Sequence, residues 1–145
     1  MGRAAAGVGR ERVLEASLAL FAERGVAATS LQMIAERLGL TKAAVYHHFR
    51  TKDAIVIAVL RPGLDQLDAV VEDAWAQPGP HARAATVVRG LADIMVAQRR
   101  RYQVMMADPA VGVILSSDPA IAETFARMES ALAGPAPSPE RRLAV

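Results

Sequence analysis

Two short segments with helical periodicity, joined by the three residues Gly39-Leu40-Thr41, constrain the fold of this chain more than any other feature. In residues 31–38 the apolar side chains recur at helical spacing until Gly39 ends the run. Thr41 is a hydroxyl N-cap for the next helix, which is predicted from Lys42 to about Phe49. Two short helices with so short a glycine-containing connector cross steeply and form a helix-turn-helix.

A longer amphipathic segment precedes this pair. Leu14, Leu18 and Phe21 are spaced at i, i+4 and i+7, which predicts a helix over about 10–24 with Gly25 at its carboxyl end. Thr29-Ser30 then supply a hydroxyl cap for the helix over 31–38. The first third of the chain is therefore expected to contain three helices.

The rest of the chain is also expected to be helical, so the predicted fold class is all-α. A fourth helix is predicted over about 52–76 and contains Pro62, which removes a backbone donor and predicts a kink or break. After Pro78-Gly79-Pro80, apolar positions from Val87 to Tyr102 predict one long fifth helix, with three arginines near its negative carboxyl end.

Three further helix starts follow from local capping chemistry. Asp108-Pro109 and Asp118-Pro119 each place a carboxylate before a helix-initiating proline, which predicts helices over about 109–115 and 119–133. Gly134 closes the second of these, and Ser138-Pro139-Glu140 has the order of another helix start. Because only seven residues follow, this last element is expected to be cut short.

Composition narrows the possible compartments and chemistries. The chain has 145 residues, 52% of them apolar, which suits one globular domain or two small ones sharing a core. No cysteine is present, which rules out a disulfide framework, a thiolate metal site and a cysteine nucleophile, and suits a reducing compartment. No apolar run approaches the ~18 to 20 residues of a membrane span. A cytoplasmic location without a membrane partner is expected.

The charge is unevenly distributed, although the net charge is only +2. Residues 1–52 carry eight Lys or Arg against four Glu, whereas the remainder carries nine basic residues against eleven acidic ones. A basic module joined to a mildly acidic one is typical of polyanion binding, although solvated helices also show such a bias by chance.

One face of the predicted third helix carries groups that suit nucleic acid. At 100° per residue Lys42, Ala43, Tyr46 and His47 share a face, while Val45 points with His48 and Phe49 towards the first two helices. Lys can donate to guanine or phosphate, Ala can contact a thymine methyl, and Tyr and His can donate to phosphates or base edges. The alternative is an ordinary solvated helix face, and spacing alone leaves the two nearly balanced.

The residues of this region also resemble a known family, the TetR-type (tetracycline repressor family) transcriptional regulators, in their DNA-binding domain. The resemblance covers residues 9–60, about fifty consecutive positions with glycines and aromatic residues in register, and is therefore specific. It is carried by Leu20-Phe21-Ala22-Glu23-Arg24-Gly25, Thr29-Ser30-Leu31-Gln32-Met33-Ile34-Ala35, Leu38-Gly39-Leu40-Thr41-Lys42, Val45-Tyr46-His47-His48-Phe49 and Lys52.

The resemblance implies a three-helix DNA-binding domain, here 7–67, followed by a helical regulatory domain, here 68–145. It further implies a homodimer that reads a palindromic double-stranded DNA operator, and a small apolar effector whose binding tilts the fourth helix and releases DNA. Half-sites on such an operator lie about 34 to 36 Å apart. The residues implied to face the major groove or its flanking phosphates, together with nearby hydroxyl caps, are Thr29, Ser30, Gln32, Thr41, Lys42, Ala43, Tyr46, His47 and Lys52.

The chain departs from the family pattern in three places. Gly9 stands where a hydroxyl cap is common, and Pro62 interrupts the helix expected to transmit the signal. Members of the family usually continue through two more long helices that form the dimer's four-helix bundle, so the chain is expected to be truncated before them. A lost tether between two half-site readers costs ~10² to 10⁴ in avidity.

Large apolar residues in the second half of the chain are candidates for an effector pocket, because flexible methionines suit an adaptable apolar cavity. The alternative, that they simply fill the core, is the more common situation. The candidates are Trp75, Leu91, Met95, Tyr102, Met105 and Phe125.

Enzyme functions find no support in the sequence. His47 and His48 are adjacent on a helix and diverge by about 100°, so they cannot chelate a metal together. No nucleophile elbow, phosphate-cradling glycine loop or dinucleotide motif is present, and neither a cofactor nor a metal is expected. The competing hypothesis is a helical protein-interaction module, a truncated regulator that no longer binds DNA productively.

Overall fold

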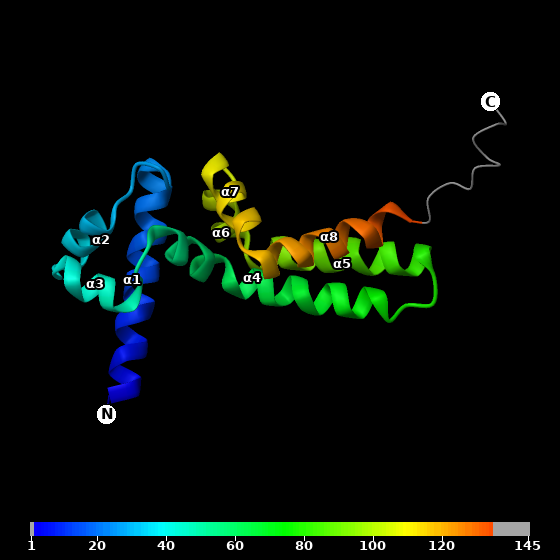
Figure 1. Ribbon diagram of the computed structural model, residues 1–145, viewed down its shortest axis with the longest axis horizontal. Helices are drawn as coiled ribbons and strands as arrows, with labels where there is room; N and C mark the ends of the chain where they lie inside the picture. The colour runs from blue at the N-terminus through cyan, green and yellow to red at the C-terminus, as the bar shows by residue number, and fades with distance from the viewer. Residues whose placement is uncertain (1, 135–145) are drawn as a thin grey trace. The chain divides into compact units, whose positions relative to one another are not determined.

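The computed structural model describes residues 2–134, which are built from helices with short connections. Figure 1 shows these helices in chain order. The helices are α1 (Gly2–Arg24), α2 (Leu31–Leu38), α3 (Lys42–His48), α4 (Lys52–Trp75), α5 (Pro80–Ala97), α6 (Arg99–Met105), α7 (Pro109–Ser117) and α8 (Pro119–Ala133). The all-α fold class is confirmed, and the start predicted at Ser138 lies outside the described residues.

The chain divides into two compact units. The first comprises the chain up to Pro62 together with Gln98–Asp118, and the second comprises Gly63–Ala97 and the chain from Pro119 onward. In the first unit α6 and α7 pack with the amino-terminal helices. The functional domains expected at 7–67 and 68–145 stay predictions.

Capping residues explain where α2 and α3 begin and where α2 ends. Both helices lie beside α1 (Figure 1). The Ser30 hydroxyl accepts a hydrogen bond from the Met33 backbone N–H, and the Thr41 hydroxyl accepts one from Ala44. Between the two helices Gly39 adopts a φ of 65°, a left-handed conformation that glycine tolerates without strain. Both predicted caps and the predicted glycine stop are confirmed.

The first helix is longer than the sequence predicts. It begins at Gly2 rather than near residue 10, so Gly9 lies within α1 and not at its cap. A Cβ at Gly9 would lie 3.0 Å from the His48 Nε2 atom, which shows how closely α1 approaches α3 at this point.

The fourth helix is continuous through Pro62, so the predicted break does not occur. The boundary between the two units nevertheless falls at this proline, with Pro62 ending one stretch and Gly63 beginning the next. The proline ring is exposed, whereas Gly63 is buried.

The predicted long fifth helix is wrong: the structure has two helices, α5 and α6, separated at Gln98. Gln98 has a φ of −107° and a ψ of 19°, outside helical values, and its side chain does not cap α6. The three arginines at 99–101 therefore open α6 instead of closing α5. The helix dipole disfavours cations at that end, although the Arg101 guanidinium donates to the Gln98 side chain.

The second unit packs the remainder of α4 together with α5 and α8. Its central cluster is Ala74, Val87 and Ala131, one residue from each helix, with Leu91 and Met128 against it. On the surface of this unit, the Arg127 guanidinium forms an ion pair with Glu72 at 2.6 Å, which lowers the pKa of that carboxyl through its hydrogen bond.

Candidate nucleic-acid interface

The orientation of α3 is fixed by two buried apolar side chains. Val45 is fully buried and Phe49 is 3% exposed, and both belong to the core of the first unit. The Arg10 guanidinium of α1 lies 4.3 Å from the centroid of the Phe49 ring and covers it from outside. With this side held against the unit, the opposite side of α3 must face solvent.

The opposite side carries the predicted candidates. Lys42, Ala43, Tyr46 and His47 are all exposed, with 45% of the Tyr46 surface accessible. The predicted orientation of the helix is therefore confirmed, while contact with nucleic acid stays a prediction. We call these four residues the α3 face.

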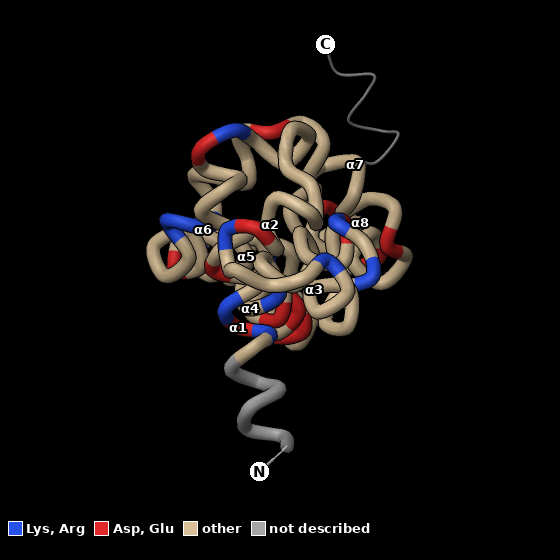
Figure 2. The backbone as a smooth tube through the Cα atoms, turned by 90° about the vertical axis from the view of Figure 1, so that its left-hand side faces the viewer, with Lys and Arg blue, Asp and Glu red and all other residues tan. Residues whose placement is uncertain are grey.

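One basic residue of this surface was missed by the sequence reasoning. Arg50 is exposed and its guanidinium lies 5.5 Å from the Tyr46 ring centroid, so it adds a cation to the edge of the α3 face. Arg50 directly follows the predicted end of the third helix at Phe49, and this position was available as a signal. Figure 2, which faces α1–α3, marks the basic positions in blue and the acidic ones in red along these helices.

The candidate side chains near the starts of α2 and α3 are exposed but already form hydrogen bonds within the chain. Ser30, Gln32 and Thr41 are exposed. Their polar atoms already have partners within the chain, because the two hydroxyls cap their helices and the Gln32 amide donates to Glu36 at 3.0 Å. A hydroxyl that caps as an acceptor keeps its own O–H for a further bond.

Two candidates are held by the loop that joins α1 to α2. Thr29 is only 2% exposed and its hydroxyl donates to the Gly25 carbonyl at 2.8 Å, so the structure does not place this side chain on the surface as expected. The Lys52 ammonium donates to the carbonyls of Val26 and Ala27, at 2.8 and 3.3 Å. Lys52, in the first turn of α4, thus holds this loop by hydrogen bonds.

Asp108 holds the same loop from the other side. Its carboxylate accepts from the backbone N–H groups of Val26 and Ala27, at 2.7 and 3.3 Å, while also capping α7 through Ala110. The hydrogen bonds from Ala110 and the loop, with the charge of Lys52, hold the pKa of Asp108 below its ordinary value. The residues before α2 are therefore fixed by two oppositely charged side chains.

A further ion pair joins α1 to α2. The Arg37 guanidinium donates to both carboxylate oxygens of Glu23, at 2.9 and 2.6 Å, and this hydrogen bonding lowers the pKa of Glu23. The pair is exposed, so its contribution is mainly to fix the geometry of α2.

Comparison with known proteins identifies this arrangement. Residues 13–59 match the family model of bacterial regulatory proteins of the tetR family. The match covers about a third of the chain, and over that part the chain is similar to members of the TetR family. The description of this family names regulatory proteins.

Two similar proteins show the extent of the likeness. The repressor KstR2 of Mycobacterium tuberculosis is 42% identical over 64 residues, which cover 44% of this chain and 32% of KstR2. The crystal structure of the TetR family regulator PfmR from Thermus thermophilus aligns with a TM-score of 0.58 and 28% identity, over 83% of this chain and 66% of PfmR. The chain spans about a third or less of the curated relatives.

The six residues expected to form an effector pocket are divided between the two units. Trp75, Leu91, Met95 and Phe125 belong to the second unit, whereas Tyr102 and Met105 belong to the first. Met105 is completely buried in its unit and Met95 is 61% exposed in the other. Neither unit by itself gathers the six, and a pocket formed by them stays a prediction.

Within residues 2–134, no helix combines the length and the apolar character that crossing a membrane requires.

Proposed function

We propose that this chain binds double-stranded DNA through the α3 face and acts as a transcriptional regulator of the TetR family, most simply as a repressor. The single observation that carries the proposal is the orientation of α3, which buries Val45 and exposes Lys42, Ala43, Tyr46 and His47. A helix held in this way fits the major groove of B-form DNA.

Some side chains of the α3 face position the protein on the duplex, and others read the base sequence. The Lys42 ammonium and the Arg50 guanidinium contact phosphates or guanine, and they fix the register of the protein on the duplex. Ala43 lets the helix approach a thymine methyl closely, while Tyr46 and His47 present hydrogen-bond donors to base edges or phosphates. Ser30, Gln32 and Thr41 lie at the starts of the two helices and flank the groove. Lys52 reaches a phosphate only if it releases the loop carbonyls.

Regulation requires a second copy and a ligand. We propose that the chain pairs as a homodimer on a palindromic operator and responds to a small molecule bound in its second half, as the family resemblance implies. Two of the similar proteins are named as transcriptional repressors or regulators, namely KstR2 and PfmR, which supports this assignment by analogy.

The first experiment measures the electrostatic part of DNA binding, which does not depend on base sequence, because the operator sequence is unknown. Binding of a fluorescein-labelled random 30-base-pair duplex is measured by anisotropy across a series of salt concentrations. We expect the logarithm of affinity to fall linearly with the logarithm of salt concentration, with a slope near −0.9 for each phosphate neutralised. Lys42→Gln should reduce that slope by about one. Arg89→Gln, an exposed change on α5, is the matched control and should leave it unchanged.

Sequence reading is tested by selecting duplexes from a random pool. An operator enriched in this way should lose roughly 1 to 3 kcal/mol of binding free energy with Tyr46→Ala, while the helical content of the variant stays native. No affinity at low salt, or identical affinities for Tyr46→Ala and the parent chain, would remove the α3 face from the proposal.

A helical protein-interaction module is the second candidate. Val88, Met95 and Val96 of α5 are 59%, 61% and 79% exposed, an unusual density of apolar side chains on one helix. Failure of duplex binding together with concentration-dependent association in sedimentation would favour this function.

A further inference from the structure

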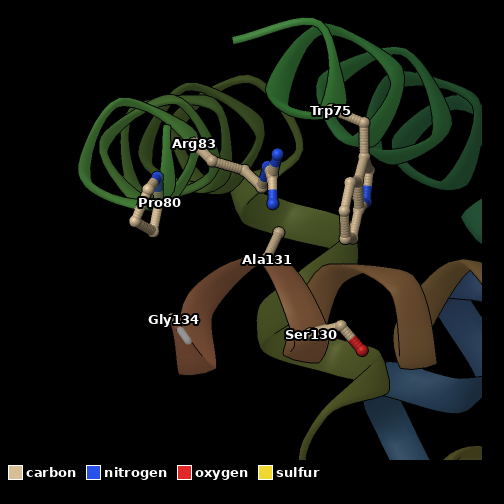
Figure 3. Close-up of a pocket in the computed structure, with 6 residues that line it drawn as sticks. All are labelled: Trp75, Pro80, Arg83, Ser130, Ala131 and Gly134. Atoms are coloured by element: carbon tan, nitrogen blue, oxygen red, sulfur yellow. The ribbon is translucent and has the colours of Figure 1, made fainter. Parts of the chain in front are cut away.

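A pocket lies within the second unit, where the carboxyl ends of α4 and α8 meet the amino end of α5. Its volume is about 330 Å³, at the lower end of the range of small-molecule sites. Figure 3 shows the lining residues, most of which are apolar or lack a side chain. They are Trp75, Pro80, Arg83, Ser130, Ala131 and Gly134.

Arg83 is the one charged residue among these lining residues, and its guanidinium is incompletely satisfied. The group lies 4.1 Å from the centroid of the Trp75 ring, a cation–π contact. The Nε atom is buried and has no hydrogen-bond partner within residues 2–134, and no described carboxylate forms an ion pair with Arg83.

A buried donor without an acceptor is rare in folded proteins, because its lost hydration is not replaced. The Nη groups of Arg83 are the donors that a ligand in the pocket can reach, and the group that fits them best is a carboxylate, which accepts two parallel bonds. The Ser130 hydroxyl donates to the Ala126 carbonyl at 2.9 Å, and its oxygen is not a hydrogen-bond partner of the Arg83 Nε atom.

The other lining residues indicate the chemistry of the part of the ligand that does not contact Arg83. The Trp75 ring, the Pro80 ring and the Ala131 methyl offer apolar surface beside the guanidinium edge. We propose that this pocket binds a small amphipathic monocarboxylate, with its carboxylate on Arg83 and a short apolar tail against Trp75 and Ala131. The site shares only Trp75 with the predicted apolar effector pocket, and the inference does not depend on the chain binding DNA.

The chain contains its own reporter for this binding. Trp75 is the single tryptophan of the sequence and lines the pocket directly. Titration of the full chain with hexanoate should therefore change the tryptophan emission saturably, and isothermal titration calorimetry should give one site per chain. Hexanol and hexylamine, which match the tail but lack the carboxylate, should bind at least 10-fold more weakly.

Variants of Arg83 separate recognition from simple apolar adsorption. Arg83→Gln should weaken hexanoate binding at least 10-fold by calorimetry, and Arg83→Lys should restore it only in part, because a lysine keeps the charge but lacks the planar pair of donors. Arg89→Gln, which removes an exposed arginine of the same helix, should bind hexanoate like the parent chain.

Circular dichroism of each variant ensures that the comparison is made between folded proteins. Equal affinities for hexanoate and hexanol, non-saturable binding, or unchanged hexanoate affinity in a folded Arg83→Gln chain would each overturn the proposal. If inorganic phosphate competes with hexanoate as strongly as acetate does, the site recognises oxyanions generally and the carboxylate assignment is wrong.

Discussion

At Gly90 the helix α5 packs closely against Val70 of α4, and Gly90→Ala measures how closely. A Cβ at this position would lie 2.4 Å from both γ-carbons of Val70 and 3.0 Å from its Cβ. Carbon atoms prefer separations of about 3.5–4.0 Å, so the new methyl group would intrude by more than 1 Å. Val70 cannot turn away, because a β-branched side chain in a helix has one strongly preferred rotamer.

Two opposing terms set the size of the effect. Overpacking of this kind costs about 1–3 kcal/mol, whereas replacing glycine by alanine inside a helix stabilises it by about 0.8–1 kcal/mol. The two terms together give a net loss of up to about 2 kcal/mol in the free energy of unfolding. We would measure it by urea unfolding, following circular dichroism together with the emission of Trp75, which reports on the same unit.

A double-mutant cycle assigns the loss to the contact. Val70→Ala removes both γ-carbons, so Gly90→Ala made in that background should become neutral or stabilising. Gly112→Ala in α7 is the matched control, because a Cβ there meets nothing within 4 Å and only the helix-propensity gain remains. The reasoning is refuted if Gly90→Ala stabilises the chain as much as Gly112→Ala does, or if its cost persists beside Val70→Ala.

Two further predictions concern the first unit. Val45→Ala should lower the free energy of unfolding by about 2 kcal/mol in a urea titration, because it removes two fully buried methyl groups that hold α3 against its unit. The control is Val113→Ala, at a position 67% exposed, which should change the free energy of unfolding by less than about 0.5 kcal/mol. Asp108 has a lowered pKa when folded, so its contribution to stability is complete above about pH 4 and is lost as the pH falls through the folded pKa. Thermal unfolding of Asp108→Asn should accordingly depend less on pH below about pH 4 than that of the parent chain, and parallel curves would contradict the bond network around this carboxylate.

The helices around α3 were predictable because their signals are local. Ser30 and Thr41 cap the two short helices in the way their sequence positions indicate, and Gly39 takes the left-handed conformation that ends α2. The exposed face of α3 followed from the helical repeat alone, since one buried residue, Val45, fixes the rotation of a seven-residue helix.

The break at Gln98 was not predictable in the same way. No glycine or proline marks it, and the apolar spacing of α5 continues into α6 without a change of period. What separates the two helices is tertiary: α5 packs in the second unit, whereas Met105 of α6 is buried in the first. Periodicity shows that a side chain is buried but does not show which core it enters.

The roles of Thr29 and Lys52 were missed for a related reason. Both were assigned to DNA from their residue type and position, but their partners are backbone carbonyls of the loop between α1 and α2. Carbonyl acceptors have no signature in a sequence, because every residue carries one. Long-range bonds such as the one from the Val26 N–H to Asp108, which spans 82 residues, are invisible for the same reason.

The hydrogen bonds between Asp108 and the loop connect the region of the family match to a later part of the chain. The family match ends at residue 59, yet the loop that leads into α2 is held by a carboxylate from the start of α7, and α6 packs beside α1. The three amino-terminal helices are therefore not an independent module within this chain. The Asp108 carboxylate accepts two backbone hydrogen bonds from the loop before α2 and a third that caps α7. Within the first unit, these bonds hold the segment 98–118 and the loop before α2 together, although the two are about 80 residues apart in the sequence.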